Sequence, residues 1–136
     1  MLVGSRRHPA ISVAVALLSG HLTIPVFNAA PAVLPDSFVR ITRVGGAKQN
    51  IVTDGPMLTF ECWNPVSAEE LAMQVLDIIE NSPGEFVEYR SDDGTPRKAW
   101  ISGYEEVGAP AQHPESDVQL SDRWVFTARL GIATNI

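Results

Sequence analysis

The sequence predicts an α+β fold in which a mixed, mainly antiparallel β-sheet carries two helices packed on one face. Apolar residues recur at helical spacing in two segments, residues 9–20 and 67–81, and alternate with polar residues in several others. Strands grouped between and after the two helices are typical of this class. The chain has 136 residues, 45% of them hydrophobic, which suits one core. We therefore expect residues 1–136 to form a single domain.

The first helix is expected over residues 9–20. Pro9 suits a first helical turn, and Ile11, Val15 and Leu18 fall on one helical face, while Gly20 is expected to end the helix. The preceding Arg6-Arg7 pair and the apolar run after it also imitate a signal peptide. The run is far shorter than the roughly 20 residues that span a bilayer, so a packed helix is favoured and no membrane partner is expected.

The segments between the helices are expected to be mainly β-structure. Alternation and β-branched residues predict a strand over residues 38–44, which the Gly45-Gly46 pair ends. A loop over residues 49–54 leads through a turn at Asp54 into a second strand, in which Leu58, Phe60 and Cys62 share the buried face. This second strand is expected over residues 57–63. Before the first strand we expect a short β-prone stretch at 21–26 and an irregular link at 28–35.

The second helix is the most clearly marked element. Ser67 and Glu70 have the spacing of a capping box, in which each residue satisfies the other's backbone N–H. A broad apolar stripe follows, made of Leu71, Ala72, Val75, Leu76, Ile78 and Ile79. We expect the helix to run to about Asn81.

Three strands are expected after that helix, at residues 86–90, 98–107 and 123–132, the first two joined by a turn at 91–96. A loop over residues 108–122 is long for a compact domain. It is open whether this loop contacts a neighbouring subunit or is an exposed excursion. The expected order is α-β-β-β-α-β-β-β.

No constellation in the sequence points to catalysis or to a cofactor. The three histidines, His8, His21 and His113, lie far apart without a ligand at i+3 or i+4, so they are expected to be solvated or capping residues rather than metal ligands. A lone cysteine, Cys62, provides neither a disulfide nor a thiolate cluster. With a net charge of −6, the chain is also a poor general binder of nucleic acid. The protein is therefore expected not to be an enzyme.

One ordered set of motifs carries a resemblance. Phe-Val-Arg-Ile at residues 38–41 leads to the Gly45-Gly46 turn, a Thr-Asp pair follows at 53–54, and the next strand ends in Cys62-Trp63 before a helix that begins Ser-x-x-Glu. Late in the chain, Pro-Glu-Ser-Asp at 114–117 precedes Arg-Trp at 123–124. The set, spread over roughly residues 9–132, resembles the tail terminators of long-tailed phages of actinobacteria. The Leu-Ser pair at 120–121 departs from the pattern, which has a proline nearer the arginine, as does the Ala- and Pro-containing stretch at 28–35.

The resemblance implies a structural virion protein of the tail or neck, assembled in the host cytoplasm. Tail terminators form a ring, expected here to be hexameric, at the head-proximal end of the tail tube. The implied partners are other copies of the chain, the major tail tube protein and a head-tail connector or stopper protein, while DNA only passes through the lumen. Another neck component, such as a connector or stopper, is the alternative.

Residues expected at the contacts between subunits or partners lie in two parts of the chain. The first part is the strand and loop around residues 45–54, and the second is the loop at 108–122 with its flank. The predicted residues are Arg40, Arg43, Gly45, Gly46, Lys48, Asp54, Pro114, Asp117 and Arg123. It is equally open that the arginines are only solvated strand positions.

Overall fold

The computed structural model describes residues 6–113 and 122–134 of the chain. Two helices and seven strands occur within these ranges. In chain order they are α1 (Ala10–Ser19), β1 (Val26–Phe27), β2 (Phe38–Gly45), β3 (Thr53–Asp54), β4 (Met57–Asn64), α2 (Ala68–Glu80), β5 (Phe86–Arg90), β6 (Pro96–Gln112) and β7 (Asp122–Ala133).

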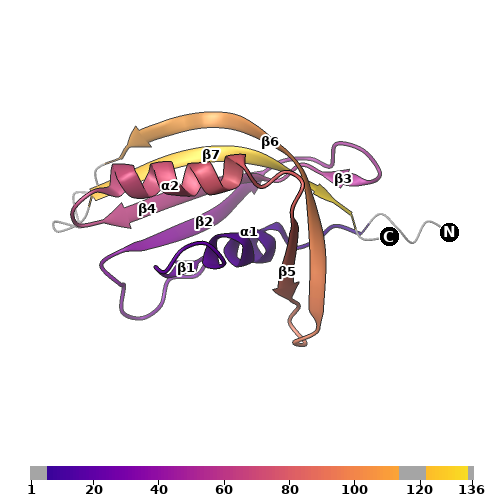
Figure 1. Cartoon of the computed structure of the whole chain (residues 1–136), viewed down its shortest axis with the longest axis horizontal. Coiled ribbons are helices and arrows are strands. Elements are labelled where there is room, and N and C mark those ends of the chain that lie inside the picture. Colours follow the sequence, from indigo (N-terminus) through magenta and orange to yellow (C-terminus); the bar gives the residue numbers. More distant parts are fainter. Residues whose placement is uncertain (1–5, 114–121, 135–136) are drawn as a thin grey trace.

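The described strands form one sheet in the order β1-β2-β4-β7-β6-β5, with β3 paired to the end of β7 (Figure 1). Every pairing is antiparallel except that of β1 with β2. The predicted α+β class, with a mixed and mainly antiparallel sheet, is thereby confirmed. The short strand β3 is an addition, because the sequence predicts only a loop and turn at residues 49–56.

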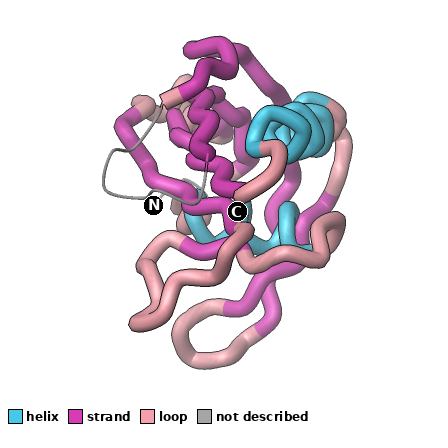
Figure 2. The backbone as a smooth tube through the Cα atoms, turned by 90° about the vertical axis from the view of Figure 1, so that its left-hand side faces the viewer, coloured by secondary structure: helices cyan, strands magenta, loops and turns pink. Residues whose placement is uncertain are grey.

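One face of the sheet carries the core. The register places Ile41 beside Phe60 and Phe60 beside Phe126, and all three side chains are buried. Buried residues of α1 and α2 belong to the same apolar cluster as these strand residues, so both helices cover this face. Figure 2 shows α2 nearly end-on beside the strands.

Helix α1 uses a different face from the predicted one. Val13, Ala14 and Leu17 are buried together with the predicted Leu18, whereas Ile11 and Val15 are only half-buried. The helix is apolar nearly all round, so periodicity alone could not fix which stripe meets the sheet and β5. Gly20 follows the helix as predicted, but it keeps a right-handed conformation with φ −73°.

Half of the predicted capping box at α2 is confirmed. The Ser67 hydroxyl accepts a hydrogen bond from the Glu70 N–H at 3.3 Å. The second half is wrong, because the Ser67 N–H donates to Asn64 Oδ1 at 2.9 Å and not to Glu70. Asn64 also accepts from the Val66 N–H at 2.8 Å, so this side chain holds the entry to the helix.

Strand β6 corrects the prediction of a loop that starts at Gly108. The strand continues to Gln112, and Gly108 and Ala111 pair with Thr127 and Val125 of β7. Shifts of register at three points let this long strand arch across the sheet (Figure 1). Residues 114–121 of the predicted loop lie outside the described residues.

Candidate functional site

The strongest candidate site is the connection between β2 and β4, residues 46–56, which we call the β3 loop. The loop folds back on itself, since the Gln49 N–H donates to the Thr53 carbonyl at 2.8 Å. Strand β3 then pairs with the end of β7, with Asp54 opposite Ile132. The pairing of β3 with β7 therefore ties the C-terminal part of the loop to the sheet.

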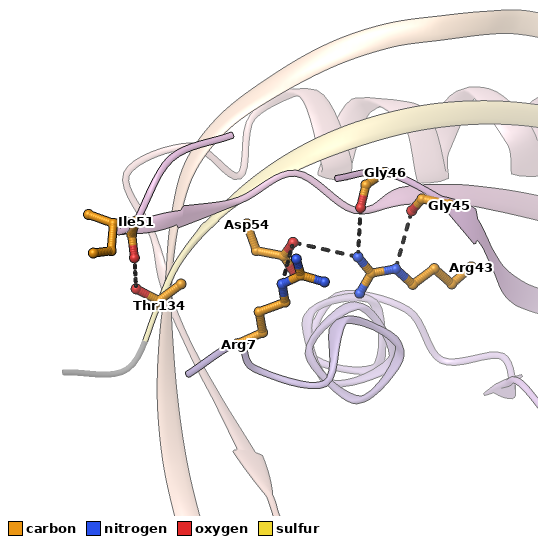
Figure 3. A network of polar contacts seen from close by, with 7 residues as sticks. All are labelled: Arg7, Arg43, Gly45, Gly46, Ile51, Asp54 and Thr134. Atoms are coloured by element: carbon orange, nitrogen blue, oxygen red, sulfur yellow. Dashed lines mark hydrogen bonds and ion pairs between the residues drawn. The ribbon is translucent and has the colours of Figure 1, made fainter. Parts of the chain in front are cut away.

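Asp54 anchors the base of the β3 loop from inside the protein. Its side chain is only 1% exposed, and its Oδ1 lies 3.5 Å from Arg43 Nη2 and 3.6 Å from Arg7 Nε (Figure 3). Neither carboxylate oxygen has a hydrogen-bond partner among the described residues, so two nearby guanidinium groups alone offset the burial of this charge. The arrangement holds the carboxylate in an ion-pair cluster and gives the loop a fixed base.

Arg43 also secures the glycine turn that opens the loop. Its Nε donates to the Gly45 carbonyl at 3.2 Å and its Nη2 to the Gly46 carbonyl at 3.0 Å. Gly46 has φ +94°, and a Cβ at this position would lie 2.1 Å from the Gly55 carbonyl oxygen. Only glycine fits here, because both the backbone conformation and the close approach of the returning chain exclude a side chain.

The far end of the β3 loop presents apolar side chains to solvent. Ile51 and Val52 are 52% and 47% exposed, and Val44, near the end of strand β2 before the loop, is 53% exposed. The Thr134 N–H donates to the Val52 carbonyl at 2.9 Å. The Thr134 hydroxyl donates to the Ile51 carbonyl at 3.3 Å (Figure 3). Exposed apolar residues grouped on a well-anchored loop are typical of a surface that binds another protein.

A second cluster of predicted residues lies on the face of the sheet opposite the two helices, which we call the open face. Arg123 Nη1 donates to Glu61 Oε1 at 2.8 Å, and Arg40 Nε lies 3.9 Å from Glu61 Oε2. The Arg123 guanidinium also lies over the Trp63 ring, 5.3 Å from its centre. Glu61 therefore bridges the two arginines, which makes them partnered residues of the open face rather than simply solvated ones.

The predicted contact residues thus fall into two groups. Arg43, Gly45, Gly46 and Asp54 come together at the base of the β3 loop, and Lys48 lies half-buried within that loop. Arg40 and Arg123 meet on the open face, while Pro114 and Asp117 lie outside the described residues. Their contact with a partner stays a prediction.

The roles of Arg7 and Glu61 are not predicted by the sequence. Arg7 stands 47 positions before Asp54, and Glu61 stands 62 positions before Arg123. No local spacing indicates either pair, because the first depends on how the N-terminal segment packs and the second on the register between β4 and β7. The alternation of apolar and polar residues over 57–63 does place Glu61 on the face opposite Leu58, Phe60 and Cys62, and this is the sequence signal for its position.

The histidines also differ in part from the prediction. His8 is buried rather than solvated, and its Nδ1 lies 2.6 Å from the Tyr89 hydroxyl. Burial lowers the pKa of His8, and the Arg97 charge lowers it further. Within residues 6–113 and 122–134, no three His, Cys, Asp or Glu side chains are grouped so that they could hold a metal ion. No helix in those ranges is long and apolar enough to cross a membrane.

Comparison of the chain with protein-family models and with curated proteins gave no match.

Proposed function

We propose that the protein is a structural virion component, a tail terminator whose copies join into a ring at the head-proximal end of the tail tube. The observation that supports this most is the β3 loop. Its base is fixed by the buried Asp54 cluster, while Ile51 and Val52 of the loop are exposed. Covering an aliphatic side chain of this size contributes about 1.5–3 kcal/mol, so the loop end is a suitable contact for a neighbouring copy.

The edge of β6 offers a second surface for a neighbouring copy. Pairing of β5 with β6 involves Pro96 to Trp100, and the Ile101 N–H still donates to the Glu85 carbonyl. Beyond Ile101 the described part of β6 pairs with β7 alone, which leaves the other edge available. Glu105, Glu106 and Pro110 lie along it and disfavour indiscriminate strand addition. A ring needs two different surfaces on each copy, and the loop end and this edge meet that requirement.

The proposal is tested first by the mass of the purified protein. Light scattering over a dilution series is expected to show assembly toward a closed ring, about 89 kDa for six chains of 14.8 kDa. Negative-stain electron microscopy then shows whether the assembly is annular. A protein that stays monomeric at every concentration, and also beside tail tube protein, would overturn the proposal.

A pair of variants tests the role of the β3 loop. The double substitution Ile51→Ser, Val52→Ser removes apolar surface that the ring would cover, so the dissociation constant of the assembly is expected to rise by at least about tenfold. Val66→Ser is the matched control, because Val66 is 91% exposed and lies outside the loop. Equal assembly of both variants would exclude the loop from the contact.

Binding experiments with the assembled protein distinguish a terminator from another neck component. A terminator is expected to bind tail tube protein and to stop its polymerisation. Binding to a portal-side connector without any effect on tube length would instead favour the connector or stopper function. In both cases the ring lies in the tail or neck of the virion, with DNA passing through its lumen.

A further inference from the structure

A basic pocket lies where the N-terminal segment, the start of α1 and the β5–β6 hairpin meet. Figure 1 shows α1 beside β5, above the tip of the hairpin. The pocket has a volume of about 260 Å³, slightly below the roughly 300–1,000 Å³ of sites for drug-sized ligands. Its lining includes four arginines, Arg6, Arg7, Arg90 and Arg97. Four of the ten Lys and Arg residues of an acidic chain therefore meet in one small hollow.

The pocket lining carries more positive than negative charge. The side chains of Arg6 and Arg97 make no hydrogen bond or ion pair within the described part of the chain, although local hydrogen bonds first, and the Arg97 charge to a smaller extent, lower the pKa of the Asp93 carboxylate. The Arg90 side chain donates one hydrogen bond, to the Gly94 carbonyl at 2.8 Å. The Nε atom of Arg7 lies 3.6 Å from Asp54 Oδ1, so Arg7 also forms an ion pair outside the pocket lining. Asp92 is the single carboxylate in the lining, so the cations outnumber it by three. Since arginine does not lose its proton, this excess persists at any physiological pH.

The start of α1 adds backbone donors to the same pocket. Pro9 is at the N-cap and provides no side-chain cap, and the first turn contains no acidic residue. The first N–H groups of a helix have no acceptor inside the helix and carry a partial positive charge. Pro9 and Ser12 both line the pocket, so this end of the helix faces it.

Two ring side chains that contact one another also line the pocket. His8 is buried, its Nδ1 lies 2.6 Å from the Tyr89 hydroxyl, and the two rings meet edge to face. Both residues line the pocket together with the arginines. These two side chains add polar atoms to the lining, and neither contributes a negative charge that would oppose an anion.

We propose that this pocket binds a phosphate group. Guanidinium forks match the paired oxygens of phosphate, and several of them around one small hollow suit a ligand with more than one negative charge. The free N–H groups at the start of α1 suit the same ligand. The phosphate belongs either to a small phosphorylated molecule or to the backbone of a nucleic acid. The pocket shares Arg7 with the Asp54 anchor but is not lined by any residue of the β3 loop, so the proposal does not depend on ring formation.

The test measures binding of inorganic phosphate to the full chain by isothermal titration calorimetry at low ionic strength. Saturable binding of one phosphate per chain is expected. Arg97→Gln and Arg6→Gln are each expected to raise the dissociation constant by about tenfold, because each removes a charge-assisted contact without breaking an existing hydrogen bond. Lys98→Gln is the matched control, since it removes the same charge from the neighbouring position of β6 and does not line the pocket. It is expected to change binding by less than about twofold.

Competition experiments then identify the source of the phosphate. Displacement of phosphate by a short DNA duplex, lost in Arg97→Gln, would support a nucleic-acid backbone as the ligand. Phosphate binding that DNA does not displace would support a small phosphorylated ligand. The proposal is overturned if phosphate does not saturate, if Lys98→Gln weakens binding as much as Arg97→Gln, or if only an acidic peptide binds.

Discussion

At the scale of single residues, Asp54 determines the position of the whole β3 loop. It is the one charged residue of the loop with a buried side chain, and its two arginine partners come from β2 and from the N-terminal segment. Burying a carboxylate is costly unless it is paired, so the loop is held where both guanidinium groups can reach it. The exposed apolar end of the loop is fixed as a consequence.

Replacement of Asp54 therefore tests this anchor. Asp54→Asn removes the charge that both arginines face and is expected to lower the free energy of unfolding by about 1–3 kcal/mol. Arg7→Gln is expected to cost less than about 1 kcal/mol, because the Arg7 side chain is 48% exposed and its pairing is screened by solvent. Urea denaturation of both variants provides the measurement. A larger effect for Arg7→Gln would contradict the assignment of Asp54 as the anchor.

His8 is expected to make stability depend on pH. Burial first, and the Arg97 charge second, lower its pKa in the folded state from the ordinary value of 6.5. The unfolded chain therefore takes up a proton before the folded chain does as the pH falls below about 6.5. This contribution to stability is fully present above that pH and is lost as the pH falls toward the folded-state pKa.

The corresponding measurement compares the urea midpoint of the wild type and of His8→Gln between pH 7.5 and 5.5. The decline in midpoint with falling pH is expected to be shallower in the variant, whatever its absolute stability. Tyr89 and Arg97 face His8 and remain in both proteins, so they do not account for a difference. Identical slopes would show that His8 takes up its proton equally in the folded and unfolded chains.

At the scale of elements, the start of α2 depends on two side chains that accept hydrogen bonds from different backbone N–H groups. Ser67 accepts one backbone N–H, from Glu70, whereas Asn64 accepts two, from Val66 and Ser67. We expect Ser67→Ala to cost about 1 kcal/mol and Asn64→Ala at least as much. Glu70→Ala is expected to be nearly neutral, because its side chain does not complete the capping box. Thermal unfolding of the three variants tests this order, and a large loss in Glu70→Ala would contradict it.

Elements with a strong local signal could be predicted from the sequence. The apolar stripe of α2 and the alternation of β4 and β7 both depend on residues close together in the chain. The end of β6 could not be predicted, because Gly-Ala-Pro-Ala-Gln at residues 108–112 has a low strand propensity. Pairing with β7 imposes the strand there, and that pairing is set by the register of the whole sheet.

The candidate sites were predictable only in part, for a similar reason. The glycine turn and Asp54 stand out as turn residues, so the β3 loop could be singled out. Its anchoring by Arg7 depends on a residue from another segment. The arginine pocket is assembled from the N-terminal segment and the β5–β6 hairpin, more than 80 positions apart, and has no local pattern.

At the scale of the whole molecule, Cys62 reports on the integrity of the core. It lies on β4 between Val39 of β2 and Trp124 of β7, and its side chain is fully buried. Burial, with a smaller contribution from the Glu61 charge, raises the pKa of the thiol to about 12. The thiolate is the reactive form, so the folded protein holds this group both inaccessible and unreactive. Its reaction requires separation of the central strands, which amounts to global unfolding.

Labelling of Cys62 by a thiol reagent at pH 8 is therefore expected to be at least about a thousandfold slower in the folded protein than in urea, as a stability of 5 kcal/mol or more implies. The double variant Cys62→Ala, Val66→Cys places the thiol at an exposed position and is expected to react quickly under native conditions. Rapid labelling of the native wild type would show that β4 opens without global unfolding. If the copies associate, labelling of Cys62 is also expected to slow as protein concentration rises, because association stabilises the folded chain. The exposed thiol of the variant provides the reference for this effect, since reaction at that position does not require unfolding.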